Sequence, residues 1–535
     1  MKMTLRSLTA IMIAVGLSIL GMGEDCEVAS QELAQDQVVV FGIPMGDINT
    51  IDPMGGFGIQ SRPIFHHIWG SLVRYPIGDA SSLDFEPDLA TKWEVSPDKL
   101  TWTFHLRKGV KWQGGYGEFT SEDVVHSLGR VKNSKVSSYR SHYEHFKEVS
   151  AIDKYTVQIT TARPDPFLLV KLANYYGGFI VCKKAIERAG AFDRLISLTK
   201  EEAIGTGPFK FEEYRPKDRI VLTRNDDYWE GKPIIEKLVF RYIPDAGARE
   251  LALLKGEIAV TLGAYDGKWL DYIKSKGIIV EPWGPADVKA LWFNLKMKPF
   301  DDRRIREAFA YGMSSEQIYE MQGKNISEYC TSPVPTRMYG HIDAGWGKYK
   351  RDPEKAKKLL AEAGYPNGLT VKLFMSSSIY FYPKMVVYQN ELKECGINLE
   401  MTQVDDTIYW GKVREGICPI GMYGGKYPTA HYWLRLFYHS DSRLGAPKAA
   451  YNWMGYSNPE VDKLIELAET TFDKKAQLDS LAKAQTLIVQ DLPAIPSIEV
   501  YAPTVRNPWF DLGYKPVANF LFISEVGLKT KILKH

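Results

Sequence analysis

Hydrophobic positions recur along the chain with two periods, one typical of helices and one of strands. The helical period is clearest after Asn458-Pro459, where apolar side chains follow at i, i+3, i+4 and i+7: Val461, Leu464, Ile465 and Ala468. This spacing predicts an amphipathic helix that begins at the proline. A second helix is predicted from Lys355 to Ala363, since Asp352-Pro353 is a start signal and Gly364 is a stop signal.

Strands are predicted where apolar and polar residues alternate, at Trp102, Phe104 and Leu106 and again at 369–373. Thr120 with Asp123 resembles a capping box and predicts a further helix start. The two kinds of signal alternate along the whole chain, which predicts an α/β fold. A length of 535 residues corresponds to about three or four domains. The chain shows no low-complexity linker, so we expect lobes joined by more than one crossing.

The first thirty residues predict a secretory signal peptide. Lys2 and Arg6 form a basic start, and the apolar run 10–20 that follows is too short to span a bilayer. Cleavage is expected after Gly23 or after Ser30. Later segments fall short of the ~18 apolar residues that a membrane span needs. We therefore expect an exported, periplasmic protein.

The five cysteines are candidates for a lipid anchor and for disulfide bonds. A lipid anchor on Cys26 is not expected, because Asp25 stands where a lipoprotein has a small residue. The five cysteines are widely spaced and form no CxxC motif for zinc or redox chemistry. One disulfide is possible, and the spacing does not give its partners.

Composition narrows the class of protein. The chain has 67 Lys and Arg against 65 Asp and Glu, a net charge of +2, which argues against nucleic acid or an anionic membrane as the partner. Hydrophobic residues make up 45%, as in folded proteins. The 13 Trp, 30 Tyr and 23 Phe are either core or a binding surface.

Motifs of catalysis and metal binding are not found in the sequence. It contains no HExxH and no GxSxG, and no Gly-Lys pair is followed by Ser or Thr as in a P-loop. The adjacent His66 and His67 would point about 100° apart on a helix, a poor arrangement for binding one metal. We expect no enzyme activity, metal or cofactor, although a site assembled from distant residues would escape this search.

A more specific pattern appears at 90–107, which reads ATKWEVSPDKLTWTFHLR. This segment resembles the signature of extracellular solute-binding proteins of family 5, the dipeptide, oligopeptide and nickel class of ABC importers. Further matches follow in the family's order: Gly205–Phe209, Asn225–Trp229, and segments starting at Trp292, Asp352, Gly455 and Leu492. The resemblance covers essentially the whole exported chain.

The resemblance implies a fold of the periplasmic-binding-protein type. This fold is an α/β clamshell with an extra inserted domain, whose two main lobes are joined by two crossover strands. The expected division is lobe I (31–73, 206–287 and 504–535), the small inserted lobe II (74–205) and lobe III (288–503). Such a protein, expected to be a monomer, encloses a small solute by hinge closure. It then delivers the solute to an ABC permease, whose ATPase subunits are separate chains.

The ligand is predicted from one departure from the family's pattern. Peptide-binding members of the family carry an Asp-Tyr pair that receives the peptide's α-ammonium; here Lys426 precedes Tyr427. A cation at this position disfavours an ordinary dipeptide and favours a peptide-like solute that is anionic or oxygen-rich. The alternatives are that Lys426 faces solvent, that the register differs by one, or that peptides are anchored differently. An exported hydrolase or a sensor on the same scaffold also stays open.

The remaining candidate ligand-binding residues come from the same alignment with the family's pattern. Aromatic residues of lobe III are expected to line the ligand: Tyr423, Tyr427 and Trp433, with further clusters at 380–382 and 409–410. The side of lobe I is expected to contribute Gly58, Gln60 and Ser61. Arg435 is a candidate carboxylate partner, and a surface salt bridge is its alternative role.

Overall fold

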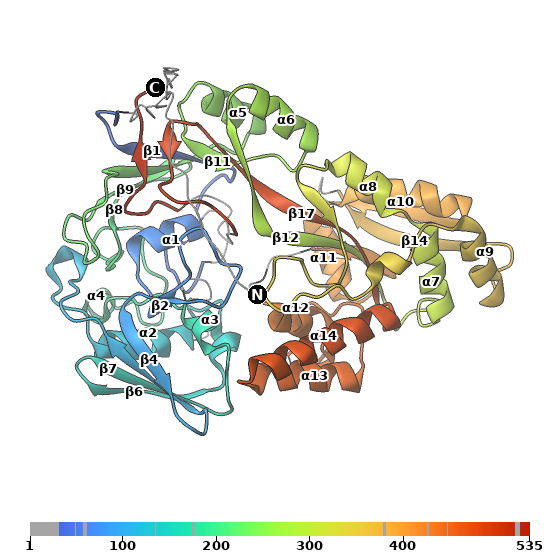
Figure 1. The fold of residues 1–535 in the computed structure, drawn as a ribbon, viewed down its shortest axis with the longest axis horizontal. Coiled ribbons are helices and arrows are strands. Elements are labelled where there is room, and N and C mark those ends of the chain that lie inside the picture. Colours follow the sequence, from blue (N-terminus) through green and yellow to red (C-terminus); the bar gives the residue numbers. More distant parts are fainter. Residues whose placement is uncertain are drawn as a thin grey trace, which may run out of the picture.

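The computed structural model describes residues 32–48, 50–56, 61–133, 135–173, 177–377, 381–424, 427, 429–446, 448–518 and 525–535. Two main lobes lie side by side and are joined by two long strands, β12 (Ile279–Phe293) and β17 (Ala494–Arg506) (Figure 1). These strands pair antiparallel from Ile279 opposite Arg506 to Trp292 opposite Ala494, with a register shift between Trp283 and Asp287. The expected clamshell with two crossover strands is therefore present.

Lobes I, II and III are kept as names for the expected parts of the chain, whose boundaries stay a prediction. The elements of lobe I are β1 (Val38–Ile43), α1 (Arg62–Ile68), β8 (Phe209–Arg215), β9 (Arg219–Arg224), β10 (Lys237–Tyr242), α5 (Ala246–Leu254), β11 (Val260–Leu262), α6 (Gly267–Ser275), β18 (Phe510–Asp511) and β19 (Lys531–Ile532). Its strands belong to a nine-stranded mixed sheet in the order β16-β12-β17-β11-β1-β10-β9-β8, with β13 paired to β17. This sheet continues through both crossover strands into lobe III.

Lobe II is built on a separate four-stranded sheet in the order β4-β5-β7-β6. Its elements are β2 (Val73–Arg74), β3 (Glu86–Pro87), β4 (Ala90–Val95), β5 (Thr101–Leu106), η1 (Gln113–Gly115), α2 (Ser121–Val131), η2 (Arg140–Tyr143), β6 (Phe146–Asp153), β7 (Thr156–Thr161), α3 (Leu168–Leu172) and α4 (Lys183–Ala189). The predicted capping box at Thr120 and Asp123 is confirmed at the start of α2. The predicted strand at 102–106 is confirmed as β5.

Lobe III is mostly helical around a short parallel sheet. Its elements are α7 (Arg303–Gly312), α8 (Ser315–Gln322), β13 (Ser327–Tyr329), η3 (Trp346–Lys348), α9 (Pro353–Glu362), β14 (Leu369–Ser376), α10 (Tyr382–Glu394), β15 (Ile397–Val404), α11 (Asp406–Arg414), β16 (Ile420–Tyr423), α12 (Ala430–Tyr438), η4 (Ser440–Ser442), α13 (Pro459–Thr470) and α14 (Lys474–Asp491). The predicted helices at 355 and 459 are confirmed as α9 and α13. Their N-caps are Asp352 and Asn458, whose side chains accept backbone N–H groups.

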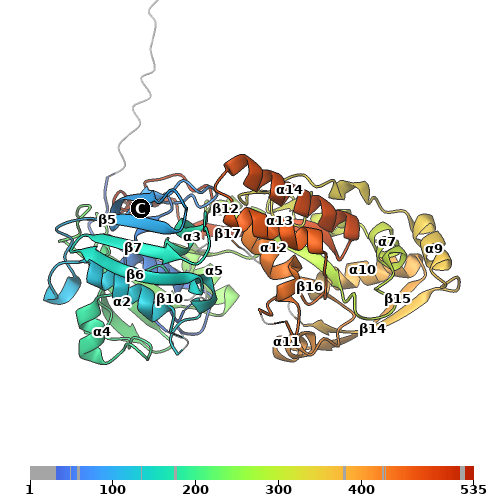
Figure 2. The ribbon, with the colours of Figure 1, turned by 90° about the horizontal axis from the view of Figure 1, so that it is seen from below.

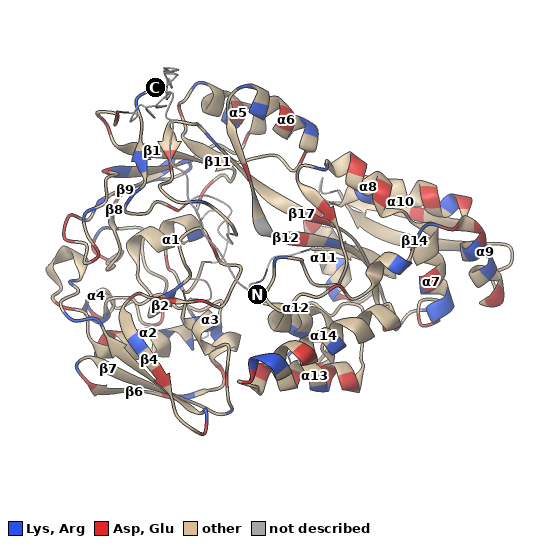
Figure 3. Cartoon of the chain, in the orientation of Figure 1, with Lys and Arg blue, Asp and Glu red and all other residues tan. Residues whose placement is uncertain are grey.

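The buried hydrophobic residues form two clusters. One lies in lobes I and II, and the other runs from α5 and α6 through the crossover strands into lobe III. Outside these cores, blue and red positions are interspersed over the outer helices, α9 and α13 included (Figure 3). In the ranges described, no helix is long and apolar enough to cross a membrane.

Candidate functional site

The segment expected to bind the solute begins where β16 ends, beside the crossover strands. β16 pairs with β12, so that Tyr423 lies opposite Ala290. A Cβ atom on Gly424 would stand 2.5 Å from Asp287 Oδ1 and 2.9 Å from Lys289 Nζ. The backbone after β16 therefore passes directly over two charged side chains of β12.

The same region holds a cluster of buried charges, which we call the hinge cluster: Asp287, Lys289 and Lys384. Lys289, 5% exposed, donates to Asp287 Oδ2 at 2.6 Å, and its ammonium lies 5.5 Å from the centre of the Phe381 ring. Lys384 projects from α10 and is 4% exposed. Burial, aided by repulsion from Lys289, lowers the pKa of Lys384 to about 8. Two buried ammonium groups thus lie close enough to repel one another, an arrangement that favours an anion.

An aromatic wall connects the hinge cluster to Tyr427. Successive ring centroids, from Phe381 through Trp410, Trp453 and Phe437 to Tyr427, are 5.0 to 6.3 Å apart. Four of these rings are only partly buried, and Phe437 is buried behind them. Trp453 was missed by the sequence analysis, because no local pattern separates it from core aromatics.

Two of the predicted aromatic residues lie beneath this wall rather than on it. Tyr423 is buried and its hydroxyl is hydrogen-bonded to that of Tyr438. Trp433 is fully buried with its ring 5.7 Å from Tyr427. Tyr423, Tyr427 and Trp433 are therefore brought together, and Tyr427 is the one partly exposed. Their contact with a ligand stays a prediction.

Arg435 and Ser61 lie apart from this group. The Arg435 guanidinium donates to both carboxylate oxygens of Glu469, at 2.8 and 2.6 Å. Ser61 is buried at the start of α1 in lobe I. The three remaining candidates, Gly58, Gln60 and Lys426, lie outside the described residues.

Lobe II contacts lobe III through α12, a contact that the sequence did not predict (Figure 2). His142 Nε2 and the Tyr432 hydroxyl are 2.9 Å apart, and the Phe167 ring stacks on His431 with centroids 3.5 Å apart. Burial lowers the pKa of both histidines to about 3. Both are therefore neutral near pH 7, which suits a contact that excludes water.

Arg163 of lobe II adds a charged contact to the same interface. Its guanidinium lies 3.4 Å from Glu469, the carboxylate that also binds Arg435. Glu469 is buried, and its two arginine neighbours lower its pKa to about 2 against the effect of burial. The Glu469 carboxylate thus binds Arg163 of lobe II and Arg435 of lobe III.

In the described part of the chain, no group of three or more metal-ligating side chains comes together. Cys182, Cys330, Cys395 and Cys418 are buried and unpaired. Cys26 lies outside the described residues.

Comparison with known proteins identifies the family to which the chain belongs. The model of bacterial extracellular solute-binding proteins, family 5, matches residues 84–444, more than half of the chain. The chain belongs to this family of ABC importer solute-binding proteins.

Individual relatives differ in what they bind. The dipeptide-binding protein of Escherichia coli K12 is 28% identical over 515 residues, covering 90% of this chain and 92% of that protein. The binding protein MoaA of A. tumefaciens R10, solved in complex with mannopinic acid, is 34% identical with a TM-score of 0.79, covering 93% of this chain and all of that one. DppA of Helicobacter pylori, solved with the peptide STSA, is 26% identical with a TM-score of 0.75, covering 93% and 98%.

Proposed function

We propose that this chain is the periplasmic receptor of an ABC importer, and that its solute is an anion rich in oxygen, such as a sugar-acid conjugate. The observation that carries this proposal is the hinge cluster, in which Lys289 and Lys384 are both buried and lie close enough to repel one another. An anionic ligand beside two such ammonium groups offsets their repulsion. An α-ammonium would be repelled.

The aromatic wall supports the rest of such a ligand. Trp410, Trp453 and Tyr427 offer apolar ring faces with polar edges, which suit a hydroxylated chain or ring. Lys426 follows Gly424 by two residues and adds a third cation in this proposal. The 34% identical relative solved with mannopinic acid is consistent with this class of ligand.

Calorimetric titration of the exported protein tests the proposal. Mannopinic acid and gluconate represent the anionic, oxygen-rich class, and the dipeptide Ala-Glu represents ordinary peptides. We expect the first class to bind and to stabilise the protein by about 2.7 kcal/mol at 100 times its Kd. Lys426→Ala should weaken binding, whereas Lys372→Met, an exposed lysine of β14, should not. Tight binding of Ala-Glu with no binding of either anion would refute the proposal.

A further inference from the structure

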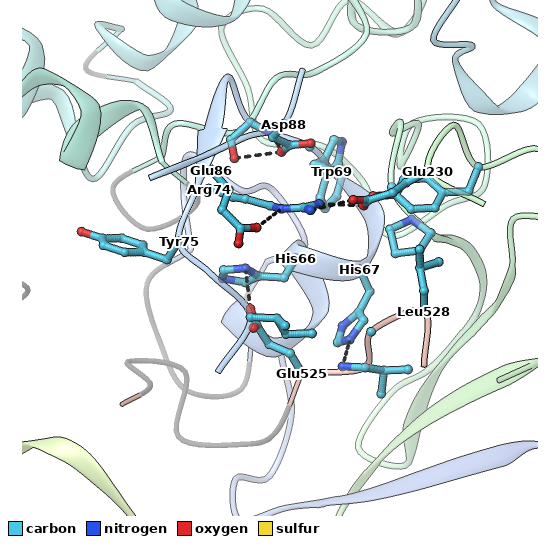
Figure 4. A pocket seen from close by; sticks show the side chains of 18 of the residues that line it. His66, His67, Trp69, Arg74, Tyr75, Glu86, Asp88, Glu230, Glu525 and Leu528 are labelled. Carbon is cyan, nitrogen blue, oxygen red and sulfur yellow. Dashed lines mark hydrogen bonds and ion pairs between the residues drawn. The ribbon is translucent and has the colours of Figure 1, made fainter. Parts of the chain in front are cut away.

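A separate cavity of about 440 Å³ lies beside α1 (Figure 4). Its walls come from α1 and the strands β2 and β3, from segments 206–208 and 228–230, and from 512–514 and 525–529 near the C-terminus. None of its lining residues belongs to lobe III. Its volume is in the range of small-molecule sites, about 300–1,000 Å³.

Two carboxyl groups, one buried and one partly buried, line this cavity from different parts of the chain. Asp88, 6% exposed, accepts hydrogen bonds from the backbone N–H and the hydroxyl of Ser71, at 2.8 and 3.3 Å. Glu525 lies 3.3 Å from His66 Nδ1. Burial raises the pKa of Asp88 to about 6 and that of Glu525 to about 7. The ionised form of each carboxyl is therefore incompletely compensated by its protein neighbours.

The cationic side chains around the cavity offset this effect of burial only in part. Arg74 is engaged by Glu230 in two hydrogen bonds of 2.8 and 2.7 Å, and its Nε lies 3.4 Å from Glu86. Burial lowers the pKa of His66 well below its usual value, which keeps its imidazole neutral. Lys529 also lines the cavity but is exposed. Carboxylates thus outnumber cations on the inner walls.

The other walls suit an organic group rather than a bare metal ion. Aromatic side chains surround the space: Trp69, Tyr75, Tyr228, Trp229 and Tyr514. Ring faces attract a cation by about 0.5–2 kcal/mol each. The Thr206 hydroxyl, 1% exposed, lines the cavity and has no hydrogen-bond partner in the part of the chain that the structure describes. A buried hydroxyl left without a partner is uncommon and points to a ligand that supplies one.

We propose that this cavity binds a small organic cation, an ammonium group on a short apolar body, with the carboxylates of Asp88 and Glu525 as its counter-ions. The Thr206 hydroxyl accepts a hydrogen bond from the same ammonium group. Since the cavity and the hinge cluster share no residue, this cation and the transported anion bind at separate sites.

Calorimetric titration of the exported chain with putrescine and with tetramethylammonium tests this site, with butanediol as the uncharged counterpart of putrescine. We expect a cation to bind and the diol not to bind. Asp88→Asn and Glu525→Gln should each weaken cation binding by about tenfold or more, the effect of losing one charge-assisted contact. Asp84→Asn, an exposed acid nearby in sequence, is the matched control.

Circular dichroism of each variant shows whether it is folded. If one of the two carboxyl variants fails to fold, the cation affinity of the other variant tests the proposal. The proposal is overturned if neither cation binds, or if both bind the carboxyl variants as tightly as the wild-type protein. Lys384→Met should leave cation binding unchanged. A failure to bind cations at this cavity therefore does not contradict the proposed anionic solute. Likewise, a failure to bind anions at the hinge cluster does not contradict the proposed cation site.

Discussion

Two groups of buried charges in this protein are built differently. In lobe II, Arg130 is fully buried and binds both oxygens of Asp52 of lobe I, at 3.0 and 2.5 Å, while its remaining donors reach the carbonyls of Ala191 and Arg194. Asp52 also accepts the backbone N–H of Ile196. In the hinge cluster, by contrast, two buried lysines lie close enough to repel one another.

The difference separates a structural pair from a binding site. A buried ion pair whose charges are equal and whose hydrogen bonds are satisfied needs nothing further and fixes two segments of chain. In a cluster of like charges, repulsion is present in the ligand-free protein and is offset when a counter-charge binds. We propose on this basis that Arg130 and Asp52 hold lobe II on lobe I, and that Lys289 and Lys384 bind the solute.

The largest expected effect comes from breaking the balanced pair. Arg130→Met leaves the Asp52 carboxylate buried without its cation, and removal of one partner of such a pair typically costs about 3–5 kcal/mol. We expect the free energy of unfolding, measured in urea, to fall by that order. The double variant Arg130→Met with Asp52→Leu should recover much of the loss. A single variant as stable as the wild-type protein would contradict the structural role.

Next in size is the effect of removing one of the two neighbouring lysines. Lys384→Met removes this cation from the hinge cluster, so binding of an anionic solute should weaken by about tenfold or more. The free energy of unfolding should stay unchanged or rise, because the repulsion from Lys289 disappears. Titration calorimetry and urea unfolding, with Lys372→Met as the exposed control, measure both quantities. A large loss of stability with unchanged affinity would assign Lys384 to structure instead.

The pKa of about 8 for Lys384 gives a third prediction, a pH dependence. Below pH 8 the ammonium is already charged and anion affinity should be flat. Above pH 8 the lysine must take up a proton to bind an anion, so affinity should fall towards tenfold per pH unit. Because this folded-state pKa is below the unfolded value near 10.5, stability of the ligand-free protein should rise between pH 8 and 10.5. Lys384→Met should abolish both slopes.

The smallest expected effect concerns the contact between lobes II and III. Tyr432→Phe removes the hydrogen bond to His142, worth about 0.5–1.5 kcal/mol, so solute affinity should fall by roughly 2- to 10-fold through a less favoured closed form. The variant Tyr272→Phe, on an exposed face of α6, serves as the control. An unchanged affinity would show that the contact does not respond to closure.

The features of this structure that the sequence predicts are those fixed by residues close together in the chain. The helix starts at Asp352 and Asn458 and the capping box at Thr120 are set by residues three or four positions apart, and all three were predicted. The hinge cluster joins β12 to α10, almost a hundred residues later in the chain, and nothing near Lys289 or Lys384 indicates that they meet. The resemblance supplied the fold, because its motifs extend along nearly all of the chain after the predicted signal peptide.

The site residues were harder to predict from sequence, because their exposure and contacts also depend on distant parts of the chain. Tyr423, Tyr427 and Trp433 are neighbours in sequence and come together, but whether a ring lies on the surface or beneath it depends on α12 and on distant rings such as Trp453. Arg435 pairs with Glu469, and Glu469 also reaches Arg163 from another lobe, a combination set by tertiary packing alone. The ligand-facing role of all these side chains stays a prediction.

The ladder between β12 and β17 is interrupted by two register shifts, one between Trp283 and Asp287 and one between Lys289 and Ala290. A two-strand connection bends with the least disruption where its ladder is already irregular. We expect the lobes to turn about these irregular points, with the paired residues on either side keeping the lobes aligned as they move.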